Sequence, residues 1–295
     1  RNARRRQRFH HTTGKYSLLP EQRLGPAAGV LAMIACALPI IIGFILPMSV
    51  LFDSALANLA EGLKPEFWSA AGHSLMLALA TAALAVGLGI VLAYACRASR
   101  SKLVHAATGI ASVGYAVPGT VLAIGVFIPL AGFDNSLDAM MRSVFGISTG
   151  LLLSGSAAGL VIAYTVRFLA ISYGTIDAGF KKTSANMDGA ARTMGATVTQ
   201  TLLRVHLPIM TPVLGAAGLL VFVDSMKELP ATLLLRPFNF DTLATHVYTL
   251  ASLDLFEDGA MAALAIVAIG LAPVLLMHRA IATGRPGARS LRQGS

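Results

Sequence analysis

Residues 177–208 read DAGFKKTSANMDGAARTMGATVTQTLLRVHLP and connect two long apolar runs of the chain. This stretch predicts a short helix over Asp188–Met194, which Gly195 ends in the left-handed conformation that glycine adopts most easily. A second, amphipathic helix is expected over Thr197–His206. Pro208 suits the first turn of the next helix, where its missing N–H costs nothing. A helix, a glycine corner and a second helix form an element suited to docking against another protein.

The apolar runs on either side of this segment indicate a membrane protein. The chain has 295 residues, of which 55% are hydrophobic and 13% charged, whereas soluble domains carry about 25% charged residues. A bilayer core of about 30 Å requires about 20 apolar residues in a helix. Six segments are long enough, so we expect an all-α bundle of six transmembrane helices. The segments are 26–52, 70–96, 103–133, 150–176, 209–235 and 258–278.

Lys and Arg residues predict the orientation of these spans, because cytoplasmic loops carry an excess of them. The terminal segments 1–25 and 279–295, the loop Arg97–Lys102 and the segment 177–208 together hold 18 of the 23 basic residues. The other three loops hold three basic residues and nine acidic ones. We therefore expect both termini in the cytoplasm, with basic tails over 1–25 and 280–295 and one six-helix domain over 26–279.

Several function classes are disfavoured by what the sequence contains. The net charge of +9 would suit nucleic-acid binding, but the basic residues lie at the ends of apolar runs and form no patch with aromatic residues. The sequence has no G-x-x-x-x-G-K-[ST] motif for ATP and no convincing metal-ligand spacing. No nucleophile has a neighbouring base. We expect a chain that contacts lipid but not nucleic acid, and that has no catalytic residues, cofactor or metal site of its own.

The segment 177–208 resembles the EAA loop of the inner-membrane permeases of ABC importers. That pattern is E-A-A, three residues, G, nine residues, I, any residue, then L-P. The matching positions are Gly189, Ala190, Ala191, Gly195, Val205, Leu207 and Pro208. Gly189 replaces the glutamate and Val205 the isoleucine, while Asp188 lies one residue earlier and is a candidate for the missing acid. The resemblance implies that this loop binds a separate ATP-hydrolysing subunit and transmits its closure to the spans.

The resemblance extends over nearly the whole chain, and the subfamily that the chain most resembles is that of the ferric-iron permeases. The stretches that carry it are 114–127, 163–173 and 223–248, and RRRQRFHHTTGKY over 4–16 resembles the linker of fused double-length permeases. It implies a type I ABC importer permease in the bacterial inner membrane. The implied partners are cytoplasmic ABC ATPase subunits, a periplasmic substrate-binding protein and a second permease half, fused or homodimeric. The implied cargo is ferric iron, with thiamine, a sulfate-like anion or a polyamine as alternatives.

Four charged residues are expected at or near membrane depth, inside the predicted spans. Such charges usually pair with one another or face a cavity, because they are costly in lipid. Arg167 is expected near the cytoplasmic end of the fourth span, where it could extend toward the headgroups. Asp224, Lys227 and Glu228 have the spacing i, i+3 and i+4 and are expected on one helix face. All four are candidates for the translocation path or a gate. An ion pair that locks the fifth span in place is the alternative.

A self-sufficient secondary transporter is the competing hypothesis. Such transporters usually show inverted repeats, broken helices and ion sites near the membrane midplane. We find no convincing internal repeat in the sequence. The docking loop and the missing ATP motif favour a permease that depends on a separate ATPase.

Overall fold

A computed structural model describes residues 24–99, 101–184 and 186–283. Within these ranges the chain forms helices and turns and no strand, which confirms the all-α class. The chain divides into two compact units, residues 1–50 and 51–295. Most of both predicted tails, over 1–23 and 284–295, lies outside the described residues.

The first predicted span is one continuous helix with a wide turn in it. It consists of α1 (Pro26–Ile40), the π-helical turn η2 (Ile41–Ile45) and α2 (Leu46–Ala57). Pro47 lies two residues after the turn, and proline both lacks an N–H and clashes with the carbonyl four residues before it. A π turn widens the helix at that point and relieves the clash. No side chain of α1 or η2 is buried, as expected for a helix that faces lipid.

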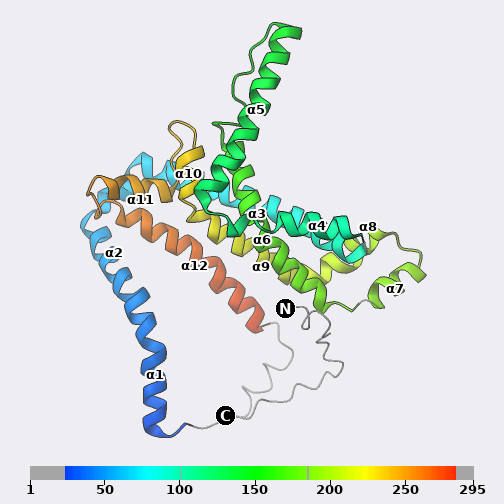
Figure 1. Cartoon of the computed structure of the whole chain (residues 1–295). Coiled ribbons are helices and arrows are strands. Elements are labelled where there is room, and N and C mark those ends of the chain that lie inside the picture. Colours follow the sequence, from blue (N-terminus) through cyan, green and yellow to red (C-terminus); the bar gives the residue numbers. More distant parts are fainter. Residues whose placement is uncertain (1–23, 100, 185, 284–295) are drawn as a thin grey trace. The chain divides into compact units, whose positions relative to one another are not determined.

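Three long helices form the core of the second unit. They are α3 (Pro65–Ala98), α6 (Ala157–Lys182) and α9 (Leu207–Met226), which pack against one another (Figure 1). Small residues allow the close approach: a Cβ at Gly89 of α3 would lie 2.6 Å from the hydroxyl of Ser172 on α6. Packing of this kind is typical of helices in lipid, where small residues let backbones come together.

The third predicted span, 103–133, is not one helix. It comprises the short helix α4 (Lys102–Ala111), the 3₁₀ turn η4 (Gly114–Ala116) and the long helix α5 (Gly119–Phe145). Apolar composition alone cannot separate a continuous helix from an apolar break, so the run was misassigned as a single span.

The break between α4 and α5 has an identifiable local cause. Pro118 precedes α5 with an extended ψ of 137°, so no helix can run through it. A Cβ at Gly114 would lie 2.2 Å from the carbonyl oxygen of Val166 on α6. The chain therefore turns here because only glycine lets it pass so close to α6.

The fourth and fifth predicted spans are helices, but their first and last residues differ from the predicted bounds. α6 begins at Ala157 rather than at residue 150, because the Ser156 side chain caps it by accepting a hydrogen bond from the Gly159 N–H. The fifth helix starts early, through α8 (Val198–Thr201) and the π turn η5 (Leu202–His206), and continues into α9. As in the first helix, the π turn lies just before a proline, here Pro208.

The fifth span also ends nine residues before its predicted end at residue 235. α9 stops at Met226, and Pro230 then starts a separate short helix, α10 (Pro230–Leu235). The remaining elements are η3 (Leu59–Leu63), α7 (Asn186–Thr193), α11 (Leu243–Ser252) and α12 (Ala260–Thr283).

Within the described residues, five helices are long and apolar enough to cross a membrane. They are Pro26–Ala57, Pro65–Ala98, Gly119–Phe145, Ala157–Lys182 and Val198–Met226. The sixth predicted span, 258–278, corresponds to α12, which is 24 residues long and has an apolar segment over Ala260–Leu275. Each of the six predicted apolar segments thus contains one principal helix.

Candidate functional site

The connection between α6 and α9 folds as a helix, a glycine corner and a second helix, which confirms that prediction. α7 (Asn186–Thr193) is followed by Gly195, whose φ of +78° lies in the left-handed region. The Ala196 N–H donates to the Ala191 carbonyl at 3.0 Å and closes the turn. Thr197 then starts α8 with a capping box.

The residues that carry the EAA-like pattern separate into an outer and an inner set. The exposed ones are Gly189, Ala190, Gly195 and Pro208; the buried or half-buried ones are Ala191, Val205 and Leu207. Met194 lies beside the exposed set, and its side chain is 80% exposed. Small residues next to an exposed methionine form a shallow apolar surface, open to a partner.

Asp188 points into the bundle rather than outward. Its carboxylate forms an ion pair with Arg97, at the end of α3, with nitrogen–oxygen distances of 2.9 and 2.7 Å. His206 Nε2 lies 2.6 Å from the other carboxylate oxygen. Burial alone would raise the pKa of Asp188, but the hydrogen bonds from His206 and Arg97 outweigh it and hold that pKa below its ordinary value. The acid nearest the EAA-like pattern is therefore occupied within the chain.

A second cluster surrounds a buried ion pair between α6 and the break after α9. Arg167 Nε lies 3.0 Å from Glu228 Oε2, and the two side chains are only 16% and 6% exposed. Arg167 is the eleventh residue of the 26 in α6, roughly 15 Å along a helix about 39 Å long. The expected position near the cytoplasmic end of the span is thus wrong: Arg167 is buried near the middle of α6 and does not extend to a headgroup region.

The break before α5 and the break between α9 and α10 both lie against this ion pair. Arg167 Nη1 donates to the Val117 carbonyl at 3.2 Å, just before α5, and the Ala231 N–H donates to Glu228 Oε1 at 3.3 Å, in the first turn of α10. A Cβ at Gly119 would lie 2.9 Å from Arg167 and 3.0 Å from Glu228. The pair therefore ties both broken spans to the unbroken helix α6.

Two buried hydroxyls complete this cluster. The Tyr164 hydroxyl of α6 donates to the Thr232 hydroxyl of α10 and also lies 3.2 Å from the Glu228 carbonyl oxygen. Thr232 in turn donates to the same carbonyl at 2.6 Å. A polar group buried without a partner is costly, so these bonds fix the chain at the point where α9 ends.

Asp224, Lys227 and Glu228 do not share one helix face, in contrast to the sequence expectation. Lys227 ends α9 with φ −102° and ψ 6°, so the i, i+4 geometry does not reach Glu228. Lys227 instead pairs with Asp224 at 2.8 Å, and its side chain is 63% exposed. The three residues thus separate into a pair of the half-buried Asp224 with the exposed Lys227, and the buried carboxylate of Glu228, which pairs with Arg167.

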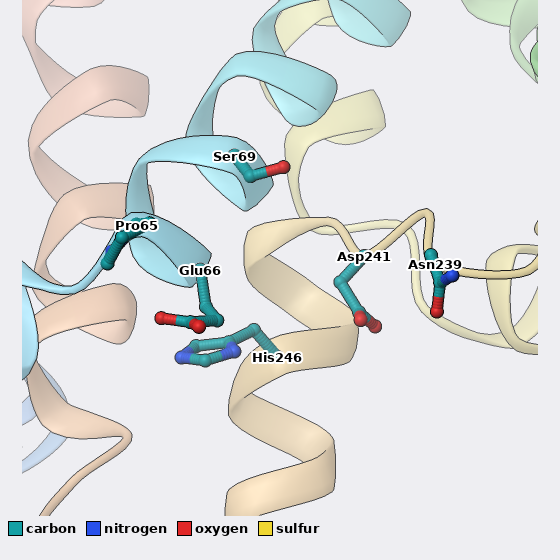
Figure 2. Close-up of a pocket in the computed structure, with 6 residues that line it drawn as sticks. All are labelled: Pro65, Glu66, Ser69, Asn239, Asp241 and His246. Carbon is teal, nitrogen blue, oxygen red and sulfur yellow. The ribbon is translucent and has the colours of Figure 1, made fainter.

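A polar pocket that the sequence did not predict lies where the N-terminus of α3 meets the segment before α11. It has a volume of about 410 Å³ and is lined by Pro65, Glu66, Ser69, Asn239, Asp241 and His246. Figure 2 shows Glu66 and His246 side by side, with Asp241 and Asn239 contributed by the neighbouring loop. Asn239, Asp241 and His246 are interspersed with apolar residues between the last two predicted spans and form no recognisable motif.

The loop at this pocket is anchored to α3 at two points. The His73 ring stacks on Phe240 with ring centroids 4.0 Å apart, and its Nδ1 lies 3.0 Å from the Asp241 carbonyl. The Leu243 N–H donates to the Ser74 hydroxyl at 2.7 Å. Among the described residues, no group of three or more His, Cys, Asp or Glu side chains could hold a metal ion.

No family model matches the chain, but individual proteins do. A Streptomyces antibioticus protein named as an ABC transporter permease is 31% identical over 234 residues, covering 78% of this chain and 94% of its own length. A Salmonella typhimurium protein named as the 2-aminoethylphosphonate transport system permease PhnV is 24% identical, covering 86% and 93%. The Haemophilus influenzae Fe(3+)-transport system permease FbpB 2 is 27% identical over 72% of this chain, but only 39% of its own length is matched.

The fold is also that of a solved permease. A chain of a bacterial alginate ABC transporter, crystallised with an alginate pentasaccharide-bound periplasmic protein, superposes with a TM-score of 0.65 at 17% identity. The superposition covers 84% of this chain and 92% of that one. With this fold, the EAA-like loop and a permease relative of 31% identity matched almost end to end, the chain belongs to the ABC transporter permease family.

Proposed function

We propose that this chain is the permease subunit of an ATP-driven importer and forms one half of its translocation path. The observation that carries the proposal is the element formed by α7, Gly195 and α8, which connects two of the three core helices. Its partners would be a cytoplasmic ABC ATPase, a periplasmic substrate-binding protein and a second permease half. The permease would lie in the bacterial inner membrane with both termini in the cytoplasm.

The exposed surface of α7 suits the role of docking to the ATPase. Gly189 and Ala190 expose backbone and a methyl group only, and Met194 offers a flexible apolar side chain beside them. Methionine adapts its shape to a partner surface better than other apolar residues do. Because Asp188 is paired inside the chain, docking would depend on shape and apolar contact more than on that carboxylate.

The buried pair of Arg167 and Glu228 is the candidate gate. It lies where two spans break, and non-helical backbone at membrane depth is tolerated only where it is buried in protein or lines a water-filled cavity. A charge pair that closes there can also open, since each partner comes from a different segment. Asp224 and Lys227, which pair with each other instead of with Glu228, would then lie beside the path rather than in it.

Ferric iron is the cargo that we propose, and iron would be a passing substrate rather than a resident cofactor. Support comes from the stretches 114–127, 163–173 and 223–248 and from the FbpB 2 relative. A 2-aminoethylphosphonate-like anion is the second candidate, because the PhnV relative matches more of the chain. Uptake of radioactive ferric iron and of 2-aminoethylphosphonate, in cells with and without the chain, distinguishes them. Loss of neither uptake in cells without the chain would exclude both cargoes.

The coupling role is tested with Gly195→Glu. A side chain at φ +78° is strained, and a bulky acid would also obstruct the docking surface. We expect the chain to insert normally but to stop transport and to release the ATPase or leave its hydrolysis uncoupled. Gly146→Glu is the matched control, because Gly146 has φ +69° and open space around it at the end of α5. Transport that survives in the Gly195 variant would exclude this loop as the coupling element.

A further inference from the structure

Asp188 of α7 is bound on both sides by residues of the core helices. Arg97 approaches one carboxylate oxygen through two of its nitrogens, Nε at 2.9 Å and Nη2 at 2.7 Å. His206 approaches the other oxygen at 2.6 Å. Since an ionised carboxylate can only accept hydrogen bonds, His206 donates through Nε2. Charge-assisted bonds of this kind are about twice as strong as neutral ones.

Arg97 also joins α3 to the end of α6. Its Nη1 donates to the Phe180 carbonyl at 2.7 Å, in the last turn of α6, and more weakly to the Thr183 carbonyl at 3.3 Å. Its Nη2 donates to the Thr183 and Ser184 carbonyls at 3.3 and 3.1 Å. The carbonyls at a helix end have no partner within the helix, and a guanidinium with five donors can satisfy several of them together.

His206 is held just as firmly at the start of α9. Its side chain is 0% exposed, and its ring lies 5.7 Å from that of Tyr94 on α3 and 5.4 Å from that of Phe180 on α6. Its Nδ1 is buried without a hydrogen-bond partner, so Asp188 is the one polar group that the ring engages in the described part of the chain. Within the described residues, the hydrogen bond to Asp188 is thus the one polar interaction that fixes the orientation of the His206 imidazole.

We propose that Arg97 and His206 are positioning residues which, through Asp188, fasten the docking helix α7 to α3, α6 and α9 together. A push on α7 would then move the ends of three core helices as one body and would not be absorbed by a flexible connection. Neither Arg97 nor His206 belongs to the EAA-like pattern. The inference rests on the proposed docking of α7 to an ATPase.

The test compares ATP hydrolysis with transport in the assembled importer, reconstituted with its ATPase and binding protein. His206→Leu keeps much of the side-chain volume but removes the donor, and Asp188→Asn removes the charge. We expect both variants to assemble and hydrolyse ATP, while transport per ATP falls about tenfold, as the loss of one hydrogen bond to a charged group predicts. His206→Gln retains a donor amide and should recover most of the ratio.

Asp177→Asn is the matched control, because it removes a carboxylate from an ion pair with Lys181, a largely exposed side chain near the same end of α6. An unchanged transport-to-hydrolysis ratio in both His206→Leu and Asp188→Asn would overturn the proposal. So would a loss of assembly or thermal stability that accounts for the whole effect and that His206→Gln does not repair. Normal transport in Gly195→Glu would instead show that the docking role itself is wrong.

Discussion

Separating Arg167 from Glu228 should cost more stability than removing both charges. The informative variants are Glu228→Leu, Arg167→Met and the double variant that carries both changes. Each single variant leaves one charge buried without its partner, in a place where its side chain is at most 16% exposed. The double variant replaces the pair with apolar side chains of similar size.

The magnitude follows from the burial of the pair. Removing one member of a buried ion pair costs about 3–5 kcal/mol, which is roughly a 150- to 5,000-fold change in the ratio of folded to unfolded protein at about 1.4 kcal/mol per factor of ten. Replacing the whole pair with apolar residues is often neutral or stabilising. Lys227→Met, which breaks the pair with Asp224, should cost at most about 1 kcal/mol, because Lys227 is 63% exposed.

Two measurements on the same variants show whether the Arg167–Glu228 pair only stabilises the fold or also closes the translocation path. Unfolding of the purified protein in detergent gives stability, and uptake into cells or vesicles gives function. If the pair only holds the helices together, the double variant should recover both. If it closes the path, the double variant should fold but transport poorly or hydrolyse ATP without uptake. Single variants as stable as the wild type would refute the argument from burial.

Three further predictions address packing, topology and pH. Gly114→Val should destabilise the chain by about 1–3 kcal/mol, because any Cβ there meets a backbone carbonyl of α6. Gly125→Val is the control and should not destabilise it, because a Cβ at Gly125 has open space. Thermal unfolding in detergent measures the stability of both variants. In a variant that lacks Cys36 and Cys96, a cysteine placed at Thr183 should be shielded from an impermeant thiol reagent in intact cells. A cysteine placed at Asn239 should be labelled by the same reagent. Labelling at Thr183 would contradict the prediction that both termini are cytoplasmic. The stability that ionised Asp188 contributes should be fully present above its ordinary pKa of 3.8 and disappear as the pH falls through its lower, folded-state value, because its pKa is depressed on folding. A stability difference between wild type and Asp188→Asn that persists below that pKa would disagree.

Most of the fold could be predicted because its strongest signals are local. Runs of apolar residues that span a bilayer form helices, because lipid offers no hydrogen-bond partner to the backbone. Gly195 could be assigned to a helix end because glycine adopts the left-handed conformation most easily. The breaks could not be predicted from hydropathy. Pro118 and Pro230 lie within predicted apolar spans, but a proline within an apolar run is compatible with a kink, a π turn or a true break.

The site residues were found in sequence but paired wrongly. Spacing placed Lys227 beside Glu228 on one helix face, which holds only if the helix continues through both. Because the helix ends at Met226, the true partner of Glu228 is Arg167, 61 positions earlier. Neither Arg97 nor His206 was a site candidate, because the sequence placed Arg97 in a basic cytoplasmic loop and His206 at the end of an amphipathic helix. Contacts between segments distant in sequence are set by packing, which one sequence does not reveal.

The interruption at residues 112–118 sets a condition on how the chain can exist in a bilayer. Backbone N–H and C=O groups released from a helix cannot face hydrocarbon, because nothing there can bond to them. Gly114 lies against Val166, next to the midpoint of α6, while Val113 and Tyr115 beside it are each 52% exposed. The N–H groups of Val113, Ala116 and Val117 each donate to the carbonyl three residues earlier, and the Val117 carbonyl accepts from Arg167 Nη1. The interruption thus carries its own hydrogen bonds, and the chain meets the solvation requirement of this backbone internally where the helix stops.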